Sequence, residues 1–183
     1  ATSQKLTEEL GKVKDFTAEE LKDLYDIIGL GAMKFYLLRV DPKKTMVFNP
    51  EESIDFHGFT GPFVQYTHAR IKSILRKELG KGEIINSSIE FKSSLLLLEK
   101  EVIIQLEQYP TALEEACQEH NPSVIANYVF NLAKSFNSFY TEHSIGNAET
   151  IEKKNLRLQI ATMTSNIIKS GMQLMGIRVP ERM

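Results

Sequence analysis

The stretch FHGFTGPFVQYTHARIKSILRK, residues 56–77, decides the fold of this chain. It begins as a coil containing Gly58 and Gly61, and Pro62 then suits the first turn of a helix, because its φ is fixed and it has no N–H to leave unpaired. The helix should run to about Leu79, since two glycines lie just beyond it. Helical spacing predicts one apolar face, fit to enter a core, which consists of Val64, His68, Ile71 and Leu75.

A second face of the same helix is predicted to combine two rings with two cations: Phe63, Tyr66, Arg70 and Lys77. Proteins that bind single-stranded RNA use aromatic rings on which an unstacked base can lie, with cations nearby for phosphate. The free N–H groups at a helix N-terminus favour anions at the same end. The alternative is that the rings belong to the core and the cations are merely solvated, which is the commoner arrangement for these residue types.

Residues 49–70, NPEESIDFHGFTGPFVQYTHAR, resemble the hallmark run of arginyl-tRNA synthetases, in which a glycine loop leads into a G-P-[YF]-x-Q-Y-x-H-x-R helix. Further blocks resemble the same family in the same order, at residues 41–44, 107–110, 125–128, 136–140 and 176–183. The resemblance implies an all-α fold, with linking helices at residues 1–54 and a DALR anticodon-binding helical bundle at residues 55–183. Asn155-Leu156-Arg157-Leu158 resembles the segment associated with the DALR domain.

The resemblance also implies a function. The intact enzyme joins arginine to its tRNA with ATP and Mg²⁺, and this chain would be its C-terminal part, which binds the anticodon stem-loop of tRNA(Arg) and contacts its own catalytic domain. The HIGH-like and KMSK-like ATP-binding patterns are absent from the sequence. We therefore expect a fragment that is inactive alone, with no catalytic residue, cofactor or metal of its own. A first residue other than methionine fits this expectation.

By the same resemblance, the anticodon base should lie among Phe63, Tyr66, Arg70, Tyr140 and Met183. The anticodon stem-loop should meet a contact loop made of Asp55, Phe56, His57, Gly58, Phe59 and Thr60. Arginine anticodons share a middle C, so that base is the one that must be read. This chain departs from the family at Phe59, where asparagine is common, and at Phe63, where tyrosine is frequent. Phe63 can still stack but cannot donate a hydrogen bond, and packing is favoured over base contact for Phe59.

Composition excludes several other classes of protein. The chain has 42% apolar residues and a net charge of -2, which indicates a globular protein rather than a generally basic nucleic-acid binder. Cations are nevertheless concentrated between His68 and Gly82, where five face a single acid, and such a local patch can steer a polyanion. No signal segment or long apolar run is present, so we expect a cytoplasmic monomer without a membrane segment.

Candidate metal and nucleophile sites are lacking. Cys117 is the only cysteine, which excludes a disulfide within the chain, and we expect it to be buried or half-buried. The four histidines show no spacing typical of zinc ligands, and His68 should be a core residue. Gln65 and Arg76 are expected at the surface or at a domain contact.

The rest of the chain is predicted to be helical. Thr17 and Glu20 form a capping box for a helix that Gly29 and Gly31 should break or kink. Asn49 caps a short helix. Other helices are expected at 7–13, from 93 or 94 to 108, from Thr111 to about 120, from 124 to about 140, and from 149 to about 170, with a polar connection at 81–91.

Two other functions remain open from the residues alone. A helical protein-interaction module would bind through an apolar groove, and the leucine-rich helix that starts near Leu95 is its best feature. A small hydrolase is a weaker hypothesis, because no acid-base constellation is recognisable.

Overall fold

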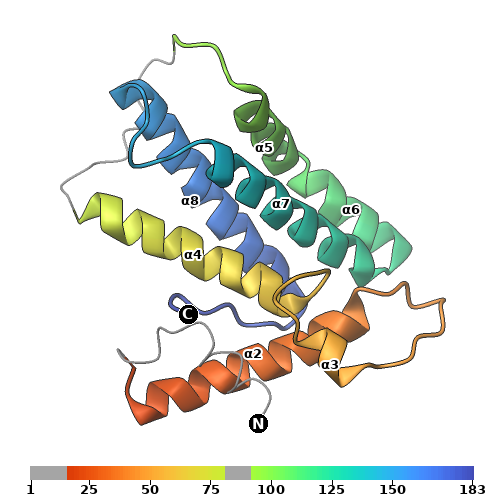
Figure 1. Ribbon diagram of the computed structural model, residues 1–183. Helices are drawn as coiled ribbons and strands as arrows, with labels where there is room; N and C mark the ends of the chain where they lie inside the picture. Colours follow the sequence, from red (N-terminus) through yellow and green to blue (C-terminus); the bar gives the residue numbers. More distant parts are fainter. Residues whose placement is uncertain (1–15, 81–91) are drawn as a thin grey trace.

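The computed structural model describes residues 16–80 and 92–183, and within these ranges the chain is helical with no strand (Figure 1). The expected all-α fold is confirmed. The helix expected at 7–13 and the connection at 81–91 lie outside the described residues. The helices are α2 (Ala18–Leu38), α3 (Pro50–Ser53), α4 (Gly61–Leu79), α5 (Leu97–Glu107), α6 (Tyr109–Glu119), α7 (Pro122–Glu142) and α8 (Ile151–Leu174).

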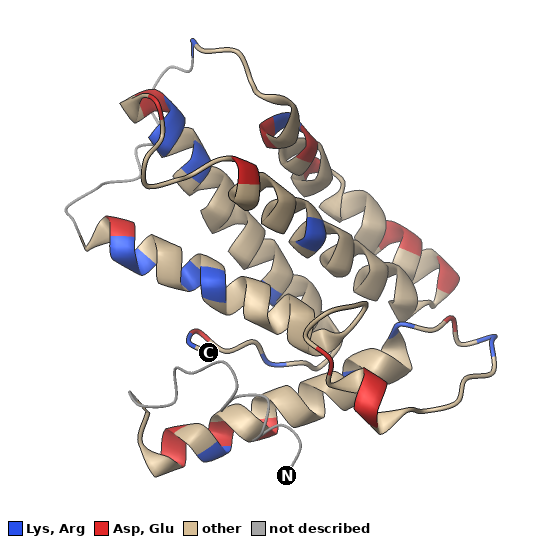
Figure 2. Ribbon diagram, in the orientation of Figure 1, with Lys and Arg blue, Asp and Glu red and all other residues tan. Residues whose placement is uncertain are grey.

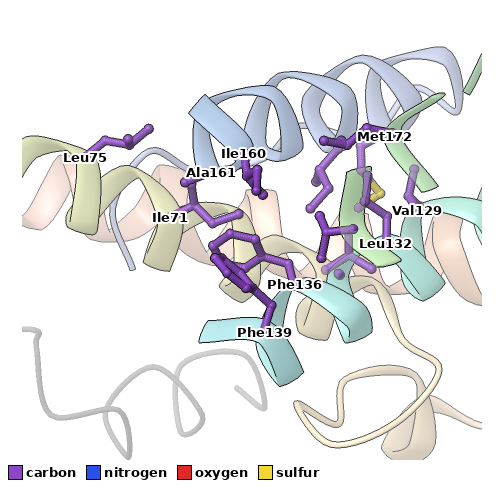
Figure 3. Close-up of a cluster of buried hydrophobic side chains, with 14 of the residues drawn as sticks. Ile71, Leu75, Val129, Leu132, Phe136, Phe139, Ile160, Ala161 and Met172 are labelled. Carbon is purple, nitrogen blue, oxygen red and sulfur yellow. The ribbon is translucent and has the colours of Figure 1, made fainter. Parts of the chain in front are cut away.

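The main core lies where α4, α5, α7 and α8 meet (Figure 3). Phe136 and Phe139 of α7 and Ile71 of α4 are fully buried there. Burying each such side chain contributes about 1.5–3 kcal/mol, so the facing apolar stripes hold the helices together. The stripe predicted for α4 is confirmed, since all four of its members are buried: Val64, His68, Ile71 and Leu75.

The predicted caps also form. Thr17 Oγ1 accepts from the Glu20 N–H at 3.2 Å while Glu20 Oε2 accepts from the Thr17 N–H at 2.8 Å, which completes the capping box of α2. Asn49 caps α3 and the Thr60 hydroxyl accepts from the Phe63 N–H at 3.3 Å to cap α4. Each such cap satisfies N–H groups that the helix itself leaves free, so local sequence sets where these helices begin.

α2 continues unbroken through Gly29 and Gly31, so the predicted break there is wrong. A Cβ atom at Gly31 would lie 2.4 Å from Nε2 of Gln65, and one at Gly61 would lie 2.9 Å from the carbonyl oxygen of Gly31. Gly31 and Gly61 therefore allow α2 and α4 to cross in close contact. Packing against α4 outweighs the modest helix penalty of glycine.

Several other helix boundaries differ from the prediction. α5 begins at Leu97 rather than at residue 93 or 94, because its N-cap is Leu96, whose N–H donates to Glu99 Oε2 at 2.9 Å. α6 begins at Tyr109 rather than Thr111, because the Tyr109 ring stacks on Tyr128 with centroids 5.4 Å apart and its hydroxyl donates to Ser170 Oγ at 2.8 Å. α8 continues past Gly171, where a Cβ atom would lie 2.5 Å from Cγ1 of Val129. Gly171 thus marks a close approach of α8 to α7.

The segment that follows α8, residues 176–183, turns back and runs between α4 and α2 (Figure 1). We call it the C-terminal segment. Gly176 has φ +67°, which glycine adopts without strain, and its carbonyl accepts from Lys34 Nζ at 2.6 Å. Gln65 is fully buried, and its Nε2 donates to the carbonyls of Ile27 at 3.0 Å and Arg178 at 2.8 Å. Of the two positions expected for Gln65, the surface is wrong, because the side chain is buried, and its amide instead makes a contact between the bundle and α2 of the linking region.

Cys117 also differs from its expectation. It lies exposed on α6, because the buried face of that helix is formed by Ala112 and Ala116. None of the described helices is long and apolar enough to cross a membrane.

Candidate nucleic-acid interface

A pocket of about 360 Å³ opens beside the C-terminal segment. Four of the five residues expected around a base line it together: Tyr66, Arg70, Tyr140 and Met183. Its other lining residues are Phe16, Ala69, Ser73, Ile74, Arg76, Lys77 and Arg182. Residues far apart in the sequence thus meet in one pocket, of a size suited to a small planar ligand.

Tyr66 and Met183 form the apolar wall of the pocket. Met183 is only 8% exposed and belongs to a small cluster with Leu24, Ile28 and Ala69. Tyr66 is half-buried against this cluster, and its ring meets that of Phe56 edge to face with centroids 6.2 Å apart. Tyr66 is therefore held by packing while part of its ring reaches the pocket.

Arg70 and Tyr140 form the polar wall. The guanidinium carbon of Arg70 lies 4.8 Å from the centre of the Tyr140 ring, a cation–π arrangement. Its Nη1 donates to Asn137 Oδ1 at 3.5 Å, and Asn137 Nδ2 donates in turn to Thr67 Oγ1 at 2.9 Å. Because a guanidinium has five N–H donors, Arg70 is oriented by these contacts and can still donate to a ligand.

Phe63 lies apart from this pocket. Its ring packs on Phe130 with centroids 5.2 Å apart, and it borders a separate hollow with Leu98 and Lys134. Phe63 and Arg70 are seven positions apart, which is about 10 Å along the helix at 1.5 Å per residue. Asn137 of α7 bonds to α4 at Thr67, which lies between them. Phe63 therefore shares a helical face with Arg70 but does not line the same pocket.

The contact loop, residues 55–60, is fixed at both ends. Asp55 Oδ1 accepts from the His57 N–H at 2.7 Å, and the Thr60 hydroxyl donates to the Asp55 carbonyl. Phe59 packs edge to face on Phe35 with centroids 5.5 Å apart, so the packing expected for it is confirmed. The exposed residues of the contact loop are Asp55, His57 and Gly58. The ring of Phe56 connects the loop to Tyr66 in the pocket.

Basic residues follow one another along α4 (Figure 2), and some of them line the pocket. Arg76 and Lys77 are exposed and line the pocket, and Arg182 adds a cation from the C-terminal segment. Glu78, the acid among them, is buried on the other side, where its carboxylate lies 3.1 Å from Lys154 Nζ. Four of the five predicted cations thus lie along α4, Lys81 lies outside the described residues, and Arg76 is exposed as expected.

His68 and Glu181 meet next to this patch. His68 is 1% exposed, its Nδ1 lies 3.1 Å from the Ser165 carbonyl, and its Nε2 lies 3.6 Å from Glu181 Oε1. Burial lowers the pKa of His68 in spite of the nearby carboxylate, so the imidazole is neutral near pH 7. The core position predicted for His68 is confirmed. Among the described residues, no cluster of histidine, cysteine or acid side chains suits a metal ion.

Acid should weaken the fold through this pair. The pKa of Glu181 is about 2 in the folded chain against 4.5 for a free side chain, so its stabilising contribution is present above pH 4.5 and is lost as the pH falls to 2. The pKa of His68 lies below its ordinary 6.5, so the unfolded chain takes up this proton first and stability starts to fall below pH 6.5. Urea unfolding of the wild type and of Glu181→Gln should differ by at most about 1 kcal/mol near pH 7, because Glu181 is half exposed. The difference should shrink between pH 4.5 and 2, and a constant difference would contradict the assignment.

Comparison with known proteins now identifies the fold and its relatives. The family model of the DALR anticodon binding domain matches residues 64–183, more than half of the chain. The chain belongs to this family. Arginine–tRNA ligases of Flavobacterium psychrophilum and Parabacteroides distasonis are 49% and 43% identical to it over its whole length. It spans only about 30% of the length of these curated relatives.

Solved structures agree with the DALR assignment. Thermus thermophilus arginyl-tRNA synthetase superposes with a TM-score of 0.85 and 31% identity, covering all of this chain and 30% of that one. Plasmodium falciparum arginyl-tRNA synthetase has a TM-score of 0.80 at 19% identity, which supports the fold alone. The family resemblance seen in the sequence is confirmed, and the DALR match includes Arg157 in the segment that suggested it.

Sequence reasoning missed several pocket residues, among them Phe16 and Arg182. Arg182 lies in the block at 176–183, directly before Met183, so that block held a usable signal. Phe16 precedes the Thr17 cap of α2, and the sequence gave no indication that it lies at the pocket. Only the packing of α2 on α4 brings it there.

Proposed function

We propose that this chain is the C-terminal part of an arginyl-tRNA synthetase and that it binds the anticodon stem-loop of tRNA(Arg). The observation that carries the proposal is the single pocket that unites Tyr66, Arg70, Tyr140 and Met183 beside exposed cations. Membership of the DALR family and the match to arginine–tRNA ligases support it.

The pocket can read an unpaired base by two means. The exposed part of the Tyr66 ring and the Met183 side chain offer an apolar surface on which the base stacks. Arg70, oriented by Tyr140 and Asn137, presents N–H donors to the acceptors on the Watson–Crick edge of cytosine. The middle C of arginine anticodons is the base that we place here.

The phosphate backbone then follows the basic side of α4. Arg76 and Lys77 lie on the rim of the pocket and would meet the phosphates that flank the flipped base. The exposed residues of the contact loop, with Phe56 beside Tyr66, would press on the stem-loop. Phe63, in its neighbouring hollow, would contact a flanking nucleotide rather than the base in the pocket.

Catalysis belongs in this proposal to the rest of the synthetase. ATP and Mg²⁺ would act in a catalytic domain to which residues 1–54 connect the bundle, and the chain alone would not form aminoacyl-adenylate. We expect a cytoplasmic monomer.

The protein-interaction alternative gains little support. Val102 and Leu106 of the leucine-rich helix α5 are buried in the main core, so this helix uses its apolar stripe inside the bundle. Leu95 and Leu97 remain exposed near its start, and neither lines the pocket that holds Tyr66 and Arg70.

The decisive measurement compares two RNA stem-loops. One carries an arginine anticodon and the other has only its middle C replaced by U, so that both have the same charge and the same salt-dependent binding. We expect about tenfold or greater preference for the C form, because a well-placed pair of hydrogen bonds to a base edge discriminates by about 1–3 kcal/mol. Equal affinities would contradict base reading by this pocket.

A further inference from the structure

The C-terminal segment supplies one side of the pocket, through Arg182 and Met183. Its position is set before these residues, where Lys34 and Gln65 hold the carbonyls of Gly176 and Arg178. Next to the pocket the segment is also held at residue 181, which is half exposed and lines no part of this pocket.

Glu181 is held by two helices. Its Oε2 lies 3.2 Å from Lys72 Nζ on α4, and its Oε1 lies 3.1 Å from Lys169 Nζ on α8. The imidazole of His68, also on α4, faces the same oxygen at 3.6 Å. The backbone is held too, because Arg76 Nη1 donates to the Glu181 carbonyl at 2.9 Å.

We propose that Glu181 is a positioning residue of the pocket: by joining α4 and α8, its carboxylate fixes the C-terminal segment so that Met183 lies beside Tyr66. This inference rests on the proposed function and adds to it a residue that does not touch the RNA. The same carboxylate pairs with Lys72 and Lys169, so these two cations are less available to bind phosphate without regard to sequence.

The other ion pairs of the segment are less suited to this task. Arg178 pairs with Asp23 at 3.0 Å with both side chains about 60% exposed, and exposed single pairs contribute little. Among the described residues, Arg182 forms a single ion pair, with Glu20, whereas Glu181 faces two lysines and an imidazole. Partial burial would raise the pKa of Glu181, yet hydrogen bonds from Lys169 and Lys72 and the nearby charges lower it to about 2. The folded chain thus favours the charged carboxylate at this position.

The test uses Glu181→Gln, which keeps the shape and removes the charge. Asp23→Asn is the matched control, because it removes a carboxylate that pairs with the same segment, and Asp23 does not line the pocket. The readout is the ratio of affinities for the C and U stem-loops. We expect Glu181→Gln to lower this ratio by about three- to tenfold, chiefly because the affinity for the U stem-loop stays the same or rises. Asp23→Asn should leave the ratio unchanged.

A double-mutant cycle separates positioning from simple stabilisation. If Glu181 acts through Met183, the variant carrying both Glu181→Gln and Met183→Ala should have the same ratio as Met183→Ala alone. Additive losses would overturn the inference. A residue that only stabilised the fold would lower the melting temperature and leave the ratio of the folded protein unchanged.

A measurement without RNA completes the test. With ¹³C-methyl methionine, the Met183 resonance, assigned from Met183→Ala, should move toward the value of an unstructured methionine in Glu181→Gln and stay in place in Asp23→Asn. An unmoved resonance in Glu181→Gln would overturn the inference. If Met183→Ala and Tyr66→Ala both bind the arginine stem-loop as tightly as the wild type, the proposed function fails, whatever the resonance shows.

Discussion

Replacing Glu99 by alanine should lower the free energy of unfolding by about 3–5 kcal/mol, because it breaks a buried ion cluster by removing one partner. Glu99 is completely buried at the start of α5 and faces two cations of α8. Its Oε2 lies 2.5 Å from Lys153 Nζ and its Oε1 accepts from Arg157 Nε at 3.0 Å. Chemical denaturation of wild type and variant would measure the loss.

The rest of the cluster explains why the loss should be large. Arg157 is 1% exposed, and its other nitrogens donate to the Ser144 carbonyl at 2.7 Å and to Glu149 Oε2 at 2.8 Å. Burial would raise the pKa of Glu99, but hydrogen bonds from Lys153, the Leu96 N–H and Arg157 lower it overall. A charged carboxylate is thus the stable form in the fold, and its removal leaves the buried cations without the group that they face.

Two further variants test that reasoning. Glu149 is 62% exposed, so Glu149→Ala should cost about 1 kcal/mol or less although it also pairs with Arg157. Replacing the whole triad, with Glu99→Leu, Lys153→Met and Arg157→Met together, should recover most of the stability, because desolvation of the ions is avoided. A Glu99→Ala loss no larger than that of Glu149→Ala would contradict the importance of the buried cluster.

Local sequence was enough to predict the parts of the fold that depend on neighbours in the chain. The capping box at Thr17 and Glu20, the Asn49 cap and the apolar stripe of α4 all follow from spacing and hydrogen-bonding capacity. The helix at Gly61–Leu79 was predicted to within one residue at its start. These features are the same whatever the helix packs against.

Features that depend on distant partners were not predictable. By sequence alone Gly31 is expected to break the helix. In the fold, Gln65 and Gly61 lie so close to it that a side chain at residue 31 would not fit. Nothing in the sequence around Arg157 indicates that its partner is Glu99, which lies more than fifty residues earlier. Phe63 shares a helical side with Arg70 by spacing, yet Asn137 of α7 contacts α4 between them.

The candidate site shows the same division. Tyr66 and Arg70 are four residues apart on one helix, so their proximity could be predicted from periodicity. Tyr140 and Met183 were placed with them by family resemblance alone, and the pocket brings all four together. Glu181, which no pattern singled out, holds the segment that carries Met183.

Tyr66→Ala should weaken binding of the arginine anticodon stem-loop by about 5- to 150-fold, the equivalent of the 1–3 kcal/mol that a ring–base stack contributes. The half-buried ring lies beside Met183, so its loss opens the apolar wall of the pocket. Tyr66→Phe keeps the ring and is the matched control, with affinity close to that of the wild type. Fluorescence anisotropy with a labelled stem-loop would measure both, and a loss in Tyr66→Phe equal to that in Tyr66→Ala would contradict stacking.

Arg70 separates base reading from charge attraction. Its guanidinium is oriented over Tyr140 and bonded to Asn137, which suits directed hydrogen bonds to a base more than a loose contact with phosphate. Arg70→Lys keeps the charge but loses the planar fork, so it should lower the C-to-U ratio by about tenfold while the salt dependence of binding stays the same.

Lys77→Ala should show the opposite behaviour. Lys77 lies exposed on the rim of the pocket, so its loss should weaken both stem-loops equally and reduce the salt slope by about one. If Arg70→Lys instead left the C-to-U ratio unchanged, Arg70 would be a phosphate contact, and discrimination of the middle base would have to come from Tyr66 and Met183 alone. Stacking is tolerant of sequence, so these two side chains could not by themselves account for a tenfold preference for C.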